Sequence, residues 1–322
     1  MHLGSDDRHQ WGVILAGGEG ARLKSLTRFV SGEDTPKQFC RLLGGQSLLA
    51  QTTQRISRKI RSERTLYVLL NSHEHFYGTE LRNVPTTHMV VQPSNRGTLP
   101  AILSSLIHII RQDQNALVAF FPSDHHYAEE ERFMSGVDLA FNAAGSNPET
   151  VILLGVAAKR AETEYGWIEA TPAMSADSQA GLLRVKRFWE KPSARTAGEL
   201  LERGCVWSTF VMVGRAQAFL DLIRDRAADI YQAFEPFLAL PESVSINDRL
   251  HKIYQYFTTP ADFSQLVLSG MPERLGVWCL GDVGWSDLGD PRRVMTVLDE
   301  AGIANEWMNS WRTRAVAVAA GQ

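Results

Sequence analysis

Short apolar runs alternate with longer segments of helical spacing, and this alternation restricts the fold of the chain more than any other feature. Each run has the length of a buried strand and is bounded by turn residues. A strand, a helix and a second strand at this spacing form a largely parallel sheet with right-handed crossovers and helices on both faces. The runs in the first half are Trp11 to Ala16, Thr65 to Asn71, His88 to Gln92, Ala116 to Phe121 and Thr150 to Val156.

The pattern changes after residue 156, where strands joined by loops predict an additional layer beside the main sheet. We expect these strands at Tyr165 to Ala170, Leu182 to Trp189, Val206 to Val213 and Leu275 to Leu280. Helices are expected at Ser47 to Ile60, Thr98 to Ile110, Ala194 to Arg203, Ala216 to about Tyr256, and from Pro291 onward. The chain has no internal repeat and no linker rich in Pro, Gly or Ser, so one domain is expected.

The charge balance excludes partners that need a broad cationic surface. Lys and Arg number 33 against 36 Asp and Glu, a net charge of −3, so we expect neither nucleic acid nor a membrane as a partner. Three widely spaced cysteines lack the pairing of a zinc site and indicate a reduced, cytoplasmic protein. No apolar stretch is long enough to span a bilayer. The sequence leaves open whether the chain forms a homo-oligomer.

A glycine-rich loop follows the first expected strand, in the segment Leu15-Ala16-Gly17-Gly18-Glu19-Gly20-Ala21-Arg22-Leu23. Glycines let a loop turn its amide N–H groups toward a phosphate and let the oxygens approach closely. The segment is neither a Walker A loop nor the dinucleotide fingerprint. Taken alone, the glycines would equally suit a tight turn between a strand and a loop.

Two cations near this loop favour a polyphosphate ligand. Arg22 lies within the loop, and Lys37 follows in Pro36-Lys37-Gln38-Phe39. A guanidinium grips phosphate oxygens with two parallel hydrogen bonds, and a lysine supplies a compact charge near the transferred group. Considered in isolation, Lys37 would be read as a solvated surface residue.

Two carboxylates follow expected strands and suit a magnesium ion. Asp124 ends the apolar run Phe120-Phe121-Pro122-Ser123, and Asp287 lies in Gly284-Trp285-Ser286-Asp287-Leu288-Gly289. Ligands of open α/β sheets gather at the carboxyl ends of strands. Mg2+ needs one or two protein carboxylates plus phosphate and water. Asp124 could instead cap the following turn.

The second half of the chain carries groups that suit a sugar phosphate. Tyr165-Gly166-Trp167-Ile168-Glu169 and Trp189-Glu190-Lys191-Pro192 combine aromatic rings, a carboxylate and a lysine. We expect Glu169 to accept hydrogen bonds from hydroxyl groups and Lys191 to pair with the phosphate. The tryptophans themselves are equally consistent with core packing.

Together these motifs resemble those of the sugar-1-phosphate nucleotidyltransferases, and most closely those of the mannose-1-phosphate guanylyltransferases. Leu15 to Leu23 resembles the signature loop LAGGxGxRL, and Pro36 to Phe39 is similar to PKQF. Pro122 to His125 resembles PADH. Tyr165 to Glu169, Glu190 to Pro192 and Trp285 to Gly289 are similar to GYGYIE, EKP and WSDLG. The resemblance extends from Trp11 to roughly Leu298, and six motifs in the correct order make it specific.

The resemblance implies an α/β, Rossmann-like nucleotidyltransferase fold with a mixed, mainly parallel central sheet flanked by helices. It implies a flexible N-terminus over residues 1–10, a catalytic domain over 11–300 and a C-terminal tail over 301–322. No room remains for the cupin-like isomerase domain of longer relatives, which implies a monofunctional chain.

The resemblance also implies a role for each matching residue. Arg22 and Lys37 are expected to be catalytic, and Asp124 and Asp287 to bind Mg2+. The residues expected to bind the nucleotide are Leu15, Ala16, Gly17, Gly18, Gly20, Gln92, Thr98 and Asp124. The residues expected to bind the sugar phosphate are Gly166, Glu169, Lys191 and Ser208.

Two departures from the family pattern bear on specificity. The family's WNSG is replaced by Trp207-Ser208-Thr209-Phe210, which exchanges Asn for Ser208 and Gly for the bulky Phe210. The family's RNTAPA is matched by Arg96-Gly97-Thr98-Leu99-Pro100-Ala101, so Gly97 removes an amide side chain. The sugar and the base therefore both stay open.

The expected reaction is attack of a sugar-1-phosphate oxygen on the α-phosphorus of a nucleoside triphosphate. GTP and mannose 1-phosphate would give GDP-mannose and pyrophosphate, mainly through positioning and charge neutralisation. The alternatives are the same chemistry on a different sugar or base, and a catalytically silent regulatory subunit that binds a nucleotide sugar. The retained cations and both carboxylates favour an enzyme over a silent subunit.

Overall fold

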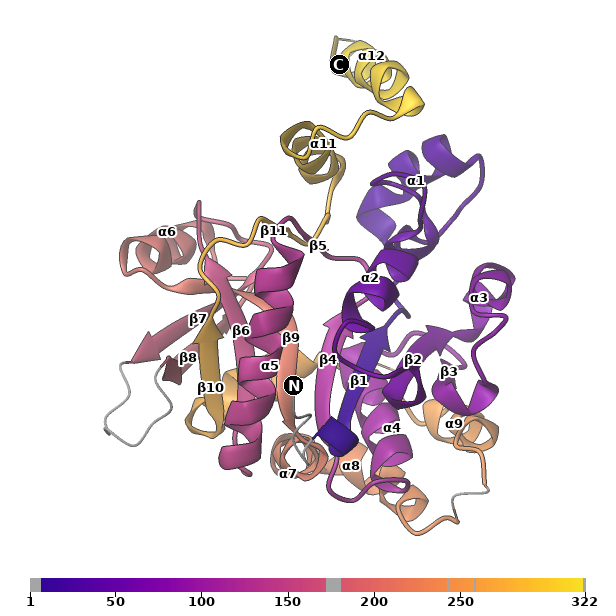
Figure 1. Cartoon of the computed structure of the whole chain (residues 1–322), viewed down its shortest axis with the longest axis vertical. Helices are drawn as coiled ribbons and strands as arrows, with labels where there is room; N and C mark the ends of the chain where they lie inside the picture. Colours follow the sequence, from indigo (N-terminus) through magenta and orange to yellow (C-terminus); the bar gives the residue numbers. More distant parts are fainter. Residues whose placement is uncertain (1–6, 172–180, 242–243, 258, 321–322) are drawn as a thin grey trace.

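The computed structural model describes residues 7–171, 181–241, 244–257 and 259–320 (Figure 1). Most of the N-terminus that was expected to be flexible, residues 1–6, lies outside this range. Residues 7–9 form a single 3-10 turn, and the first strand begins at Gln10.

Nine strands of the described residues form one mixed sheet, in the order β3-β2-β1-β4-β9-β6-β10-β8-β7. The pairings set β1, β2, β3, β4, β6, β7 and β10 in one direction, and β8 and β9 in the other. The expected mixed, mainly parallel sheet is therefore confirmed. Strand β7 also pairs with β9, so the antiparallel end of the sheet curls back on itself.

The strands of this sheet are β1 Gln10–Leu15, β2 Thr65–Leu70, β3 Met89–Gln92, β4 Leu117–Pro122, β6 Val151–Ala157, β7 Gly166–Thr171, β8 Leu182–Glu190, β9 Val206–Arg215 and β10 Leu275–Cys279. Two short strands, β5 His126–Tyr127 and β11 Trp285–Ser286, pair with each other. The α-helices are α1 Lys24–Ser31, α2 Leu48–Ile56, α3 Glu74–Glu80, α4 Thr98–Ile110, α5 Glu130–Ser146, α6 Ala194–Glu202, α7 Ala216–Arg226, α8 Ala228–Phe234, α9 Asn247–Tyr254, α10 Phe263–Leu266, α11 Pro291–Glu300 and α12 Glu306–Ala320.

The sheet separates two apolar layers, because successive side chains of a strand point to opposite faces. In β1, Trp11 and Val13 belong to the layer that contains residues of α4, α7, α8 and α9, while Ile14 belongs to the layer that contains residues of α2, α5 and α6. In β4, Phe120 belongs to the first layer and Phe121 to the second. Both faces are buried, which explains why the strands read as continuous apolar runs.

A third, smaller apolar cluster joins the two ends of the chain. Leu23 and Leu26 near α1 pack with Leu288, with Leu298 of α11 and with Met308 of α12. In Figure 1, α11 and α12 lie beside α1, away from the sheet. The segment expected as a tail over 301–322 therefore contains a helix, and residues 321–322 lie outside the described range.

The helical stretch expected from Ala216 to about Tyr256 is divided in the structure. Helix α7 ends before Ala227, whose φ of −142° and ψ of 55° are not helical, and α8 begins at the next residue. After α8, Pro236 occupies a short 3-10 turn, and α9 begins at Asn247. Proline cannot donate an intrahelical hydrogen bond, so one long helix is disfavoured there.

The strand ends place the expected site residues at one edge of the sheet. Strands β1, β3 and β4 are parallel and end at Leu15, Gln92 and Pro122. The glycine-rich loop, the Gln92 segment and Asp124 therefore meet at the same edge. In the part of the chain that the structure describes, no helix is both long and apolar enough to cross a bilayer.

Candidate active site

A cavity of about 440 Å3 opens at this edge of the sheet and contains most of the residues singled out in the sequence. One wall carries the glycine loop and the Gln92 segment, and the opposite wall is formed by β7, β8 and β9. Of the expected site residues, the lining includes Leu15, Gly17, Gly18, Gln92, Thr98, Asp124, Gly166, Lys191, Ser208 and Asp287. The geometry thus brings most of the expected nucleotide and sugar-phosphate residues into one space.

The glycine loop is held closely against its neighbours. A Cβ atom on Gly17 would lie 2.8 Å from Nε2 of Gln92, and one on Gly20 would lie 2.9 Å from Cβ of Lys37. Gly20 also has a φ of +58°, which favours glycine. The Gln38 amide donates to the carbonyl oxygens of Ala16 and Gly18, at 2.8 and 3.0 Å. Ala16 and Gly20 therefore shape the loop from behind the cavity lining.

Lys37 contacts both residues that were expected to bind metal. Its ammonium group lies 3.0 Å from Oδ2 of Asp124 and donates to the main-chain oxygen of Asp287. The Lys37 side chain is 7% exposed. Burial alone would raise the pKa of Asp287, but the charges of Lys37 and Arg293 outweigh it and hold this pKa below its usual value. Lys37 therefore links the two residues through the carboxylate of Asp124 and the main chain of Asp287.

The donor set fits Mg2+. Among the described residues, no group of three or more His, Cys, Asp or Glu side chains could hold a metal. The protein would therefore contribute Asp124 and Asp287, and phosphate and water oxygens would complete the shell, as Mg2+ accepts. A binding role for these two residues stays a prediction.

The wall formed by β7, β8 and β9 has strained backbone at the cavity. Lys191 and Phe210 both line it with positive φ angles, +44° and +60°. Phe210 lies where the register of β9 against β6 shifts, between the pairs Leu153–Met212 and Gly155–Ser208. Such bulges re-aim side chains and recur beside functional sites. The Ser208 hydroxyl accepts a 3.3 Å hydrogen bond from the Phe210 N–H.

Glu169 lies away from the cavity, which corrects its expected position. It accepts from Lys186 at 2.8 Å and from Arg203 at 3.2 Å, at a separate hollow on the outer surface. The reason is the period of two along β7, because Gly166 faces the cavity and Glu169 the opposite side. Glu190, opposite Gly166 in the pairing of β7 with β8, lines the cavity instead.

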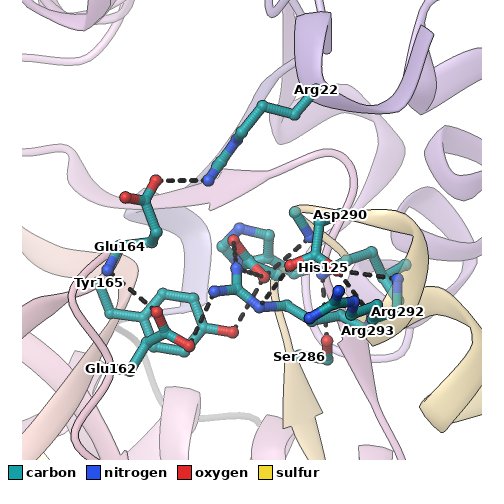
Figure 2. A network of polar contacts seen from close by, with 12 residues as sticks. Arg22, His125, Glu162, Glu164, Tyr165, Ser286, Asp290, Arg292 and Arg293 are labelled. Carbon is teal, nitrogen blue, oxygen red and sulfur yellow. Dashed lines mark hydrogen bonds and ion pairs between the residues drawn. The ribbon is translucent and has the colours of Figure 1, made fainter. Parts of the chain in front are cut away.

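Arg22 lies outside the cavity lining, in an ion pair with Glu164. Its Nη1 atom is 2.6 Å from Oε2 of Glu164, and both side chains are about half exposed. Glu164 lines the cavity. Figure 2 shows the Arg22 side chain extending toward the Glu164 carboxylate. The pair therefore connects the glycine loop to the loop before β7.

Several charged residues of the site carried no motif signal. Glu164 and Asp262 line the cavity, and Arg293 holds the Asp287 carboxylate from behind with Nη1 at 2.9 Å from Oδ1. Glu190 also lines the cavity, and it belongs to the motif Glu190 to Pro192. Its place next to Lys191 at the end of β8 could have identified it as a site residue from the sequence. The other three lie in loops or at a helix start, where no periodicity predicts orientation.

The expected base segment is fixed by contacts from the second half of the chain. The Tyr254 hydroxyl donates to Oε1 of Gln92 at 2.9 Å. Thr98 donates to Asp262 at 3.3 Å and accepts from the N–H of Phe263 at 2.8 Å. A Cβ on Gly97, whose φ is +86°, would lie 2.3 Å from the carbonyl oxygen of Ala261. The close approach of this main-chain carbonyl explains a glycine at position 97.

Glu190 is a cavity carboxylate that is destabilised in its ionised form. Burial, and then the nearby charge of Asp262, raise its pKa from 4.5 to about 7. The folded protein thus binds this proton more tightly than the unfolded chain. The contribution of Glu190 to stability is greatest below pH 4.5 and is lost as the pH rises through 7.

We therefore expect Glu190→Gln to stabilise the protein at pH 8 but not at pH 4.5. The gain in the free energy of unfolding should grow across this range to about 2 kcal/mol. Urea unfolding at several pH values measures it. Glu199→Gln is the matched control, since Glu199 is half exposed on α6. Equal gains for Glu190→Gln at pH 4.5 and pH 8 would contradict the prediction.

Comparison with known proteins gives a consistent picture. A family model described as nucleotidyl transferase matches residues 11–301. The chain is 30% identical over 284 residues to the alginate biosynthesis protein AlgA of Pseudomonas aeruginosa, covering 86% of this chain and 56% of that protein. It is 29% identical over 286 residues to mannose-1-phosphate guanylyltransferase 2 of Escherichia coli O157:H7, covering 86% of this chain and 57% of that protein. The chain thus spans little more than half the length of these curated relatives.

Solved structures agree with the fold. A crystal structure described as mannose-1-phosphate geranyltransferase from Thermus thermophilus superposes with a TM-score of 0.77 at 26% identity. The match covers 90% of this chain and 79% of that chain. A putative glucose-1-phosphate thymidylyltransferase from Bacillus anthracis, at 13% identity, has a TM-score of 0.53 and covers 92% and 96% of the two chains. The second likeness concerns the fold alone.

Proposed function

The chain belongs to the nucleotidyl transferase family, and we propose that it transfers a guanylyl group from GTP to mannose 1-phosphate. The products are GDP-mannose and pyrophosphate. The name of one relative, mannose-1-phosphate guanylyltransferase 2 at 29% identity, supports the sugar and the base. The observation that carries the proposal is one cavity lined by the glycine loop, Lys191, Asp124 and Asp287, with Lys37 in contact with the Asp124 carboxylate and the main-chain oxygen of Asp287.

The reaction needs two polyanions side by side. An oxygen of the sugar phosphate forms a bond to the α-phosphorus of the triphosphate, and the bond from that phosphorus to the pyrophosphate oxygen breaks. No water and no covalent enzyme intermediate are needed, so positioning and charge neutralisation supply the catalysis. The glycine loop would hold the triphosphate by its N–H groups, and Lys191 would pair with the sugar phosphate.

The positive charge of Lys37 would interact favourably with the phosphoryl group that is transferred. Lys37 is held by Asp124 and by the main chain of Asp287, so its ammonium is oriented before any substrate binds. A preoriented cation stabilises developing charge without reorganising. Asp124 and Asp287 would hold Mg2+, which neutralises and polarises phosphate oxygens when bound.

The proposal is tested by measuring pyrophosphate release with a panel of triphosphates and sugar 1-phosphates. We expect the highest kcat/KM with GTP and mannose 1-phosphate. A higher value with another base or sugar would retain the reaction and replace the substrate. Binding of a nucleotide sugar without turnover on any pair would instead support the silent regulatory subunit.

Phe210 bounds the expected sugar end of the cavity, on the same wall as Ser208 and Lys191. Its φ of +60° costs about 1 kcal/mol for a residue with a Cβ atom. We infer that the ring limits the size of the sugar that this wall accepts.

We expect Phe210→Gly and Phe210→Ala to raise the kcat/KM for N-acetylglucosamine 1-phosphate relative to mannose 1-phosphate by about tenfold. Both variants remove the ring, and Gly also relieves the backbone, so Gly should be more stable than Ala by about 1 kcal/mol. Steady-state kinetics and thermal unfolding measure the two effects separately. An unchanged ratio of the two kcat/KM values in both variants would show that the ring does not limit the sugar.

A further inference from the structure

Arg293 is the most highly connected charged side chain around Asp287, and no motif of the family accounts for it. Its side chain is 10% exposed. Nη1 lies 2.9 and 3.0 Å from the two carboxylate oxygens of Asp287, Nη2 lies 2.8 Å from Glu162, and Nε lies 3.2 Å from Asp290. In Figure 2, Glu162, Tyr165 and Asp290 lie around the Arg293 side chain.

The Asp287 carboxylate is saturated on one oxygen and retains capacity on the other. Oδ1 accepts from the Tyr165 hydroxyl at 3.0 Å, from the Gly289 N–H at 2.9 Å and from Arg293. Within the described residues, Oδ2 accepts from Arg293 alone. A carboxylate oxygen offers about two lone-pair sites, so Oδ2 is the oxygen that can take another ligand.

The start of α11 places Arg293 where it can make these contacts. Asp290 caps the helix by accepting from the N–H groups of Arg292 and Arg293, and Pro291 occupies the first turn. This arrangement favours a helix start at a defined residue. A Cβ on Gly289 would lie 2.4 Å from Oδ2 of Asp287 and 2.7 Å from Nη1 of Arg293, so the glycine leaves room for the pair.

The same guanidinium anchors the loop that carries Glu164. Glu162 binds Arg293 through Oε2 and accepts the N–H of Glu164 through Oε1 at 3.1 Å. The Arg293 guanidinium carbon also lies 4.6 Å from the centre of the Tyr165 ring. The planar guanidinium group of Arg293 contacts three carboxylates and one aromatic ring at the same time. The ammonium group of a lysine is a single point charge and could not make all of these contacts.

We propose that Arg293 is a positioning residue, which orients the Asp287 carboxylate through Oδ1 and leaves Oδ2 available to a divalent cation. The inference rests on the proposed function, because it assigns Asp287 to a cation that accompanies the triphosphate. Partners behind a metal ligand typically change metal affinity by about 10- to 100-fold when they are removed.

The test compares Arg293→Met and Arg293→Lys with Arg292→Met, since Arg292 is the neighbouring arginine on the same helix. Mn2+ binding in the presence of GTP is followed by the relaxation enhancement of water protons, which reports Mn2+ bound on the protein. We expect about tenfold weaker Mn2+ binding in both Arg293 variants and wild-type binding in Arg292→Met. The value of kcat should fall by about 100-fold, with a small change in KM for mannose 1-phosphate.

A double variant separates positioning from general support of the fold. Arg293 acts through Asp287 in the proposal, so Asp287→Asn with Arg293→Met should bind Mn2+ no more weakly than Asp287→Asn alone. If Arg293→Met fails to fold, Arg293→Lys retains the charge and gives the same comparison. Wild-type Mn2+ affinity in folded Arg293→Lys, or additive losses in the double variant, would overturn the proposal.

The outcome also distinguishes this inference from the proposed function. Mn2+ binding that depends on Arg293, without turnover on any substrate pair, would support the positioning role and count against the transferase activity. Turnover that is unaffected by Arg293→Met would count against the positioning role alone. Absence of Mn2+ binding by the wild-type protein would overturn the cation role of Asp287 and the role of Arg293 with it.

Discussion

Replacing Lys37 with methionine should reduce kcat by at least about 100- to 1,000-fold, because a preoriented charge at the reacting phosphate is lost. Lys37 is 7% exposed and contacts both Asp124 and Asp287. Methionine keeps most of the apolar stem in place, and Asp124, at 27% exposure, can be hydrated. We therefore expect the free energy of unfolding to change by less than about 2 kcal/mol.

Initial rates of pyrophosphate release and urea unfolding measure the two quantities for Lys37→Met. Lys24→Met is the control, since Lys24 is an exposed lysine at the start of α1. It should retain wild-type activity. If Lys37→Met keeps more than about a tenth of the wild-type kcat, the ammonium group does not act on the transferred phosphoryl group.

Replacing Asp287 with asparagine should lower kcat by roughly 1,000-fold, equivalent to several kcal/mol of lost charge stabilisation. Asparagine keeps the size of the side chain and its acceptor oxygen for Tyr165 and Gly289. It removes the negative charge that faces Lys37 and Arg293. We therefore expect Asp287→Asn to weaken binding of the divalent cation more than it lowers the stability of the fold.

The measurement for Asp287→Asn is kcat as a function of Mg2+ concentration, with Asp282→Asn as control. Asp282 lies five residues earlier, is 57% exposed and pairs with Lys159. Its variant should follow the wild-type curve. A wild-type Mg2+ curve for Asp287→Asn would exclude Asp287 as a ligand of the catalytic ion.

The framework of the fold could be predicted because it depends on local patterns. The apolar runs from Trp11, Thr65, Ala116 and Thr150 form strands within one or two residues of the expected ends. The helix expected from Ser47 begins there, because the Ser47 side chain caps α2 by accepting from the N–H of Ala50. Strand ends and helix caps depend on only a few neighbouring residues, so they can be predicted from the local sequence.

The orientation of single side chains was harder to predict. Glu169 lies within a matching motif, yet its place in β7 turns it to the outer face. Glu162 and Arg293 meet across more than a hundred positions of sequence. No spacing rule connects them, because the contact depends on how α11 docks against the loop before β7.

Gly97 shows a related limit. The sequence indicated the loss of an amide side chain near the base, whereas the structure supplies a steric reason for the glycine, the carbonyl of Ala261. Asn95, two residues earlier, lines the cavity and accepts the N–H of Gly97 at 3.0 Å. An amide group is therefore still present in this segment at the cavity.

The docking of the last segments has a consequence for synthesis of the protein. The cavity needs Gly17 from one end of the chain and Asp287 from the other, and β11 joins β5 just before Asp287. A nascent chain that has left the ribosome as far as β10 would have the glycine loop but would lack Asp287 and Arg293. If the cavity carries out the proposed transfer, activity should appear only after Asp287 has been synthesised and β11 has paired with β5.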